Sequence, residues 1–257
     1  MSFFKKMLAS VGIGSAQINT ELDTAEVALG GELRGTVYVE GGQTDQSIDN
    51  IYLTLKTNYI RESNDRKIRE TGTIAKYLIA EGFPLRAGER KQIPFRFKLP
   101  DQMPVTLRNV PIWVETGLDI DLAVDPKDED LIQVLPDAKM QTVLDAVDLL
   151  GFRLREVTND YAPRLGGALP FVQEFEYVPG NRFRGYLDEL EVLFFPRGDA
   201  LELVLQVDRR ARGLSGLFAE AMSMDERFLR VPLSKEELLR GPQAVAAQLE
   251  AMIARHL

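Results

Sequence analysis

The chain has no cysteine, and its 257 residues include one histidine, His256. Without cysteine there is no disulfide, no thiolate nucleophile and no Cys-type zinc site, and this composition suits a reducing cytosol. A single histidine excludes a His metal cluster and a HExxH zinc site, and it disfavours a His-based triad. We therefore expect a cytoplasmic protein with no Cys- or His-based catalytic residue, no cofactor and no metal ion.

Positive charge and long apolar runs are also scarce. The sequence has 31 basic and 39 acidic residues, a net charge of -8, and an acidic chain without a basic module is a poor ligand for nucleic acid. No apolar run approaches the roughly 18 residues that a membrane span needs. The apolar stretch at the start of the chain is too short for a secretory signal. The sequence therefore indicates neither nucleic-acid binding nor a membrane span.

Hydrophobic residues make up 45% of the chain, which is ample for a buried core. In the first half they alternate with polar residues, in runs that end at Gly, Asp and Asn, and this pattern is typical of half-buried antiparallel strands. Pro94 lies inside one run, which indicates either a strand at a sheet edge or a position at the start of a strand. Residues 16–120 are predicted to form a β-sandwich; the clearest alternating runs are 30–42, 50–57, 91–100 and 110–121.

An acidic stretch bracketed by prolines, residues 121–136, is predicted to be a linker. It places the domain boundary so that residues 1–130 form the N-terminal domain and residues 131–257 the C-terminal domain. The second half returns to short alternating strands, which we expect at 152–157, 171–178, 187–195, 200–209 and 227–233.

Helix signals flank the strands of the second half. Asp137 is a plausible N-cap for a middle helix that stops at Gly151. Ser234 and Glu237 have the spacing of a capping box, and Pro242 suits the first turn of a last helix. We therefore expect one short helix between the domains and a helical C-terminal segment.

Several phrases of the chain resemble known families. "GGELRGTVYVEGG" (30–42) and "LRAGERKQIPFRFKLP" (85–100) resemble the N-terminal domain of arrestin-like proteins. "MSFFKKMLASVGIG", "IWVETGLDIDLAVDPKDEDLI" (112–132), "VDRRARGL" (207–214) and the helical end are similar, in the same order, to the bacterial sporulation-control family of SpoOM type. The match covers essentially all 257 residues.

The resemblance implies an all-β fold of two arrestin-like antiparallel β-sandwich domains with short N-terminal, middle and C-terminal helices. It also implies a cytoplasmic regulatory protein without enzymatic activity, which controls entry into sporulation through protein contacts. No catalytic residue is carried over from the family.

The first residues are a candidate interaction element. Residues 2–13 are predicted to form an amphipathic helix, and its apolar face holds Phe3, Phe4, Met7 and Leu8. Three roles stay open: packing on its own domain, docking in the groove of a partner or of a second copy, and contact with a membrane surface, which is the least favoured.

Three arginines lie at and just after the end of the strand expected at 200–209, namely Arg209, Arg210 and Arg212. The favoured interpretation is a strand end whose charges meet acidic neighbours, and the alternative is a patch that binds a partner. Nucleic-acid binding is disfavoured because the stretch lacks interleaved aromatic residues. The following "GLSG" lacks the spacing and the lysine of a P-loop.

Trp113 is the one tryptophan, and alternation places it on the face opposite the core residues Ile112 and Val114. It packs under another element or marks a contact between domains or with a partner. The acidic cluster nearby is interpreted as a solvated linker, with a weak cation site as the alternative, since the EF-hand order of ligands is missing; its members are Asp119, Asp121, Asp125, Asp128, Glu129 and Asp130.

The favoured function is a non-enzymatic regulatory scaffold that binds unidentified protein partners through strand edges, loops and terminal helices. Self-association is left open. The alternative is a peripheral membrane or trafficking-type adaptor that uses the N-terminal helix. A hydrolase comes third, because no GxSxG, SxxK or paired-acid signature supports one.

Overall fold

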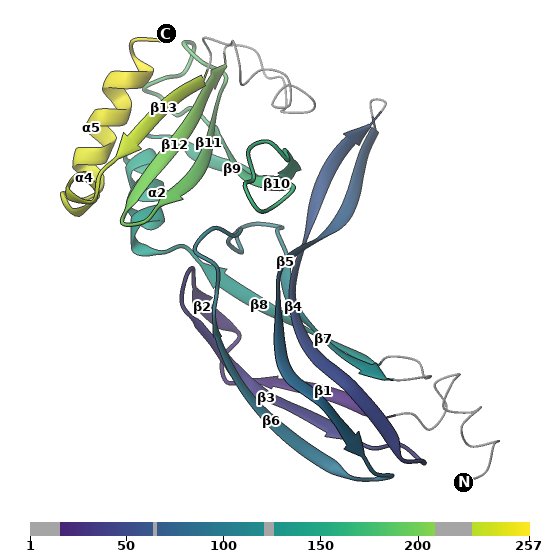
Figure 1. Ribbon diagram of the computed structural model, residues 1–257. Helices are drawn as coiled ribbons and strands as arrows, with labels where there is room; N and C mark the ends of the chain where they lie inside the picture. Colours follow the sequence, from purple (N-terminus) through teal and green to yellow (C-terminus); the bar gives the residue numbers. More distant parts are fainter. Residues whose placement is uncertain (1–15, 64–65, 121–125, 209–227) are drawn as a thin grey trace. The chain divides into compact units, whose positions relative to one another are not determined.

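The structure is a computed structural model that describes residues 16–63, 66–120, 126–208 and 228–257 (Figure 1). The chain forms two compact units, and each takes several segments. Unit 1 consists of Met1–Thr57, Thr73–Pro100 and Pro111–Val134, and unit 2 consists of Asn58–Gly72, Asp101–Val110 and Leu135–Leu257. No helix in the described ranges is long and apolar enough to cross a membrane.

Unit 1 is a sandwich of two β-sheets (Figure 1). The first sheet has the order β1-β3-β6, with β1 at Gln17–Leu22, β3 at Glu32–Glu40 and β6 at Arg90–Lys98. The second has the order β5-β4-β7-β8-β2. Its strands are β2 (Glu26–Ala28), β4 (Gln46–Ser63), β5 (Arg66–Leu85), β7 (Ile112–Ile120) and β8 (Lys127–Leu135), and the far ends of β4 and β5 belong to unit 2.

The core of unit 1 lies between these sheets. Alternate residues of β3, β4 and β7, among them Leu33, Leu53 and Val114, are fully buried. A hydrogen bond of 2.6 Å between the hydroxyls of Thr20 and Thr116 joins the sheets inside this core. A β-sandwich is confirmed for the first half of the chain, but its predicted bounds of 16–120 are not, because residues 58–72 and 101–110 belong to unit 2 and β8 belongs to unit 1. Of the two positions expected for Pro94, the sheet edge is the one observed, because β6 ends its sheet.

The predicted acidic linker is wrong for most of its length, because residues 127–135 form strand β8. Ile132 and Val134 enter the core, and the Asp128 carboxylate accepts a 2.6 Å hydrogen bond from the backbone N–H of Thr20. A strand needs apolar side chains on one face only. The acidic residues of β8 therefore hid its period-two pattern.

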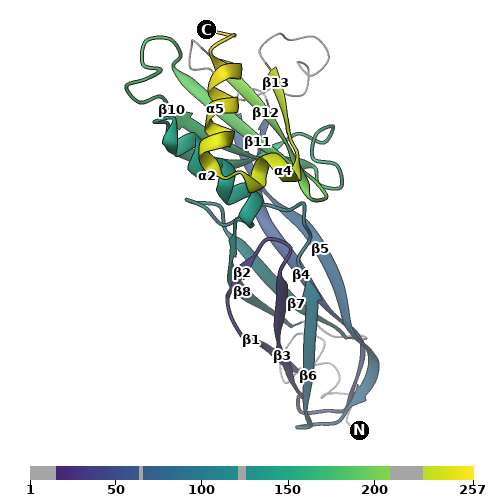
Figure 2. The same ribbon diagram turned by 90° about the vertical axis from the view of Figure 1, so that its left-hand side faces the viewer.

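Unit 2 is built on one antiparallel sheet with the order β13-β12-β11-β10-β9. The far end of β4 runs parallel to β9, with Ile60 opposite Asp160. Figure 2 shows α2 and α5 against one face of this sheet. The elements are β9 (Arg153–Tyr161), β10 (Phe171–Val178), β11 (Glu189–Arg197), β12 (Ala200–Asp208), β13 (Phe228–Leu233), α2 (Ala138–Leu149), α4 (Lys235–Leu239) and α5 (Pro242–Ile253).

The ends of these helices follow the sequence signals. The Asp137 carboxylate caps α2 by accepting a hydrogen bond from Met140 N at 2.8 Å, and Gly151 ends the helix with φ +84°. Ser234 and Glu237 form the capping box of α4. The all-β class with short middle and C-terminal helices is confirmed, whereas the arrestin-like detail of each domain stays a prediction.

Gly35 tests the packing of unit 1, because a Cβ atom there would lie 2.4 Å from the carbonyl oxygen of Glu21 and 2.9 Å from the ring of Phe95. We expect Gly35→Ala to lower the free energy of unfolding by about 2 kcal/mol or more, since overpacking displaces backbone. Urea denaturation followed by circular dichroism measures it. The control is Gly117→Ala in β7, where a Cβ has no neighbour within 4 Å; equal effects of the two variants would contradict the prediction.

Candidate interaction surfaces

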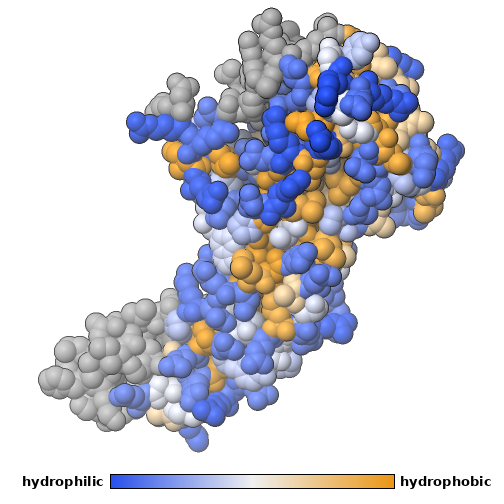
Figure 3. Space-filling view, turned by 180° about the vertical axis from the view of Figure 1, so that it is seen from behind, coloured by the Kyte–Doolittle hydropathy of each residue, from blue (hydrophilic) through white to orange (hydrophobic). Residues whose placement is uncertain are grey.

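Two of the predicted interaction elements lie outside the described residues. They are the apolar helix face, Phe3, Phe4, Met7 and Leu8, and the arginine run, Arg209, Arg210 and Arg212. Trp113 is described. In Figure 3 the surface is mostly hydrophilic, with apolar patches among the charged side chains, and the two most exposed large apolar residues in the described ranges are Leu239 (76%) and Leu131 (70%).

Trp113 lies on the outer face of the second sheet of unit 1, opposite to the core positions of β7. Its register neighbours are Lys56 on β4 and Leu131 on β8. We call the surface formed by Tyr52, Lys56, Trp113, Glu115 and Leu131 the Trp113 face. It joins a half-buried indole to an exposed leucine, and alternation in the sequence indicated the outward direction of the indole but not its neighbours.

The charged side chains on and beside the Trp113 face form ion pairs. Lys56 Nζ lies 2.8 Å from Glu115 Oε2, and Lys127 Nζ lies 3.3 Å from Glu115 Oε1. Burial by itself raises the pKa of Glu115, but the hydrogen bond and charge of Lys56, with help from Lys127, bring that pKa below its usual value. The apolar pair Trp113 and Leu131 is therefore bordered by charges that already have partners.

Removal of Lys56 shows whether this ion pair controls Glu115. In Lys56→Met we expect the pKa of Glu115 to rise, because burial then opposes ionisation with less compensation. A lowered pKa in the folded state contributes stability above the ordinary value of 4.5, and that stability is lost as the pH falls through the folded pKa. The variant should therefore lose less stability on acidification, and carboxyl-carbon NMR titration measures the pKa directly.

The matched control is Lys127→Met, because Lys127 is more exposed than Lys56 and lies farther from the carboxylate. It should raise the pKa of Glu115 by a smaller amount. Equal shifts in both variants would contradict the dominance of Lys56.

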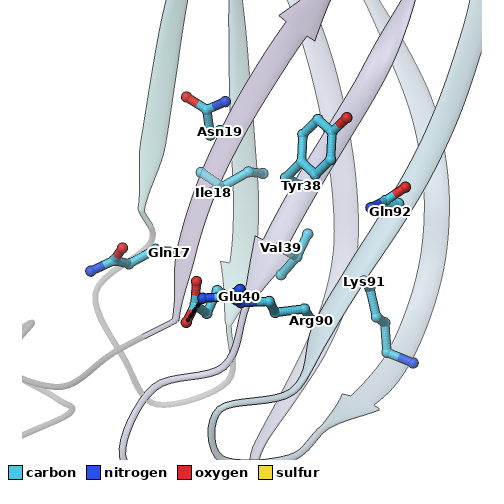
Figure 4. A pocket seen from close by; sticks show the side chains of 9 residues that line it. All are labelled: Gln17, Ile18, Asn19, Tyr38, Val39, Glu40, Arg90, Lys91 and Gln92. Atoms are coloured by element: carbon cyan, nitrogen blue, oxygen red, sulfur yellow. Dashed lines mark hydrogen bonds and ion pairs between the residues drawn. The ribbon is translucent and has the colours of Figure 1, made fainter.

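A shallow hollow of about 390 Å³ lies on the three-stranded sheet of unit 1 (Figure 4). It spans three register rows of β1, β3 and β6. The half-buried ring of Tyr38 lies beside the amides of Asn19 and Gln92, and Glu40 pairs with Arg90 at 3.2 Å. A ring flanked by amides can stack on a flat group and hydrogen-bond to it. Sequence patterns do not reveal this hollow, because the five side chains take ordinary outward positions on three separate strands.

Four glutamates gather on β10 and β11, on the face of the sheet opposite to α2 and α5. We call them the carboxylate row: Glu174, Glu176, Glu189 and Glu191. Glu174 and Glu189 are 5% and 1% exposed, and Glu191 is also buried. Glu176 and Glu191 lie directly opposite each other in the register. Since buried carboxylates are costly unless they are paired or protonated, the row marks a place where stability and charge are coupled.

Arg155 supplies a positive charge to the carboxylate row. It forms ion pairs with Glu189, at 2.6 Å, and with Glu176. Arg155 is the extra residue of a β-bulge, because Glu176 lies opposite Glu156 whereas Tyr177 lies opposite Leu154. A bulge redirects side chains locally, and sequence alternation cannot show where it occurs.

Glu174 is a buried member of the row with a raised pKa. Burial raises the pKa of its carboxyl well above the ordinary value, and the negative charges of Glu191 and Asp160 raise it further. Within the described part of the chain, Glu174 Oε2 has no hydrogen-bond partner. The described residues contain no group of three His, Cys, Asp or Glu side chains arranged to hold a metal ion.

Glu174→Gln replaces this carboxyl by an amide of similar shape. A raised pKa means that the folded state binds the proton more tightly, so stability falls as the pH rises from the ordinary value of 4.5 through the folded pKa. The variant does not lose stability in this way, because glutamine has no proton to release. We expect it to exceed the parent protein in unfolding free energy at pH 8 by about 1 kcal/mol or more, with a smaller difference at pH 5, in urea titrations.

The control variant, at Glu202, is expected to change the unfolding free energy at pH 8 in the opposite direction. Glu202 pairs with Arg197 at 2.8 Å and with Arg230 at 3.0 Å, and the hydrogen bonds from these arginines lower its pKa. Glu202→Gln should therefore destabilise the protein at pH 8. If Glu174→Gln were equally destabilising at pH 8, the carboxyl of Glu174 would be ionised and paired, contrary to the prediction.

Comparisons with known proteins agree with this architecture. The model of the family described as SpoOM protein matches residues 4–211. The chain is 43% identical to the sporulation-control protein spo0M of Bacillus subtilis (strain 168) over 239 residues, which cover 93% of each chain. The crystal structure of Spo0M from Bacillus subtilis superposes with a TM-score of 0.89 at 39% identity, over 95% of this chain and all of that one. The chain therefore belongs to the SpoOM protein family.

Proposed function

We propose that the chain is a sporulation-control regulator that acts by binding a protein partner and catalyses no reaction. The regulatory role is supported by the 43% identity to a protein named for sporulation control, which extends over 93% of both chains. A cytoplasmic location agrees with this role and stays a prediction. We place the contact surface on the Trp113 face of unit 1.

The main support for contact through the Trp113 face is the cross-strand pair of Trp113 and Leu131. Leu131 is 70% exposed, and complete burial of a leucine side chain is worth roughly 1.5–3 kcal/mol. Tryptophan is among the residues that contribute most binding energy at the centres of protein interfaces. The paired charges of Lys56, Glu115 and Lys127 around them resemble the polar rim of such an interface.

The edges of the three-stranded sheet are less suited to partner binding than the Trp113 face. Strand addition needs free backbone N–H groups along an edge. On β1, the N–H of Thr20 already donates to Asp128, and on β6, Pro94 has no N–H. Both edges therefore lack a donor that an added strand would use, and we favour contact through the face of the sandwich.

Complementation tests the proposal. The chain is expressed in a Bacillus subtilis strain that lacks its own spo0M, and heat-resistant spores are counted. We expect the parent chain to move the count toward that of the intact strain and Leu131→Asp to lose this effect at equal protein level, because a charge at position 131 opposes apolar contact. Leu239→Asp is the matched control, since Leu239 is equally exposed but lies in unit 2.

A photo-crosslinking amino acid at position 131 provides the biochemical readout. It should give a protein adduct of defined size that Trp113→Ala weakens, whereas the same group at position 239 should give none. Loss of complementation by both aspartate variants, or complementation by Leu131→Asp, would overturn the assignment of the Trp113 face.

A further inference from the structure

We propose that a hollow in unit 2 lined by Arg153, Arg182 and Arg184 binds the phosphate group of a phosphorylated side chain on a protein partner. We call it the arginine hollow. Its volume is about 490 Å³, and Leu149 and Asn181 also line it. None of the described residues that line it is acidic. The inference rests on the proposed function in one respect, namely that the phosphate group belongs to a protein partner.

The arginine hollow has an unbalanced positive charge. Arg182 pairs with Glu250, with 2.9 Å between Arg182 NH2 and Glu250 Oε1. Arg153 and Arg184 are exposed, and neither forms an ion pair with a residue in the described part of the chain. Three guanidinium groups and one carboxylate leave two positive charges at this place, in a protein whose net charge is -8. The hollow is therefore a local site for an anion on an acidic molecule.

The arginines are presented by two segments that pack against each other: Arg153 begins β9, and Arg182 and Arg184 lie in the loop between β10 and β11. Phe152 and Phe183, the chain neighbours of these arginines, are buried and stack with 4.9 Å between their ring centroids. A Cβ atom at Gly180 would lie 2.1 Å from the carbonyl oxygen of Gly151, so the two segments touch through their backbones. Because their backbone is held by this packing, the arginines lose less freedom on binding than they would on a mobile loop.

The chemistry of the arginine hollow favours a phosphate monoester over a carboxylate. A guanidinium binds either group through two parallel N–H bonds. A carboxylate carries one charge and occupies one guanidinium. A phosphorylated side chain has a charge of about -1.5 to -2 near neutral pH and three acceptor oxygens. Its charge matches the two unbalanced positive charges, and its oxygens can accept hydrogen bonds from more than one guanidinium group at once.

Apolar residues beside the arginine hollow favour a phosphate that is carried by a polypeptide. Leu149, which lines it, is 53% exposed, and Tyr186, two residues beyond Arg184, is 63% exposed. Tyrosine and arginine are enriched at the centres of protein interfaces, and arginine clusters are the usual readers of phosphorylated segments. Inorganic phosphate would make no use of Leu149 or Tyr186.

The test titrates the full-length protein with an acetylated and amidated pentapeptide that has a central phosphoserine between alanines. NMR follows the backbone amides of Gly180 and Asn181 and the arginine Nε–H groups. We expect shifts at these positions and a loss of affinity of about tenfold or more in the double variant Arg153→Gln/Arg184→Gln. Binding should strengthen from pH 5 to pH 7.5, because the second phosphate pKa is about 6 and arginine does not titrate there.

The matched control is Arg34→Gln/Arg90→Gln, which removes two exposed arginines from unit 1 and should leave the affinity unchanged. Equal binding of the unphosphorylated or aspartate peptide would contradict recognition of phosphate. Inorganic phosphate that binds as tightly as the peptide would show a small-anion site, and vesicles with phosphatidic acid that bind where the peptide does not would show a membrane site. Each of these results, or an absence of shifts, overturns the proposal.

The same titration in Leu131→Asp should be unchanged, because no residue of the Trp113 face contributes to the arginine hollow. Peptide binding therefore reports on the arginine hollow alone, and complementation by the aspartate variants reports on the Trp113 face. Failure of one proposal is thus distinguishable from failure of the other.

Discussion

Alternate burial along the strands is the constraint on which both units depend. In β3, β4 and β7 every second side chain closes the core of the sandwich, so the positions between them face outward by geometry. The register of β7 and β8 places Val114 and Ile132 in the core. Trp113 and Leu131 lie opposite each other in the same register, and they are therefore neighbours on the outer face. The composition of each outer face is therefore a consequence of core packing.

In unit 2 alternate burial also separates the two faces of the sheet, but here helices cover one of them. One face of the sheet is apolar, with Phe175, Leu203 and Val231 fully buried, and it packs against helices (Figure 2). The other face combines a small apolar cluster around Leu193 and Val204 with the carboxylate row. Buried carboxylates contribute little net stability, so the carboxylate row adds less to the stability of this face than apolar side chains of similar size would.

The surfaces described here differ in how their side chains are held. The Trp113 face lies on sheet strands and is bordered by ion pairs, whereas the arginine hollow lies at the start of β9 and on the loop after β10, which are joined by the Phe152 and Phe183 stack. Both arrangements keep the contacting groups in place before a ligand arrives. Preorganised groups lose less entropy on binding, which is consistent with the partner contacts proposed for both surfaces.

Period-two alternation and local capping signals determined much of the fold from the sequence alone: the sandwich in the first half of the chain, the helix capped by Asp137 and the capping box at Ser234. These features depend on neighbours in the chain. Strand β8, the use of residues 58–72 by unit 2, the carboxylate row and the arginine hollow were decided only by the tertiary structure. Their residues are distant in sequence, and strand pairing, a bulge and loop contacts bring them together.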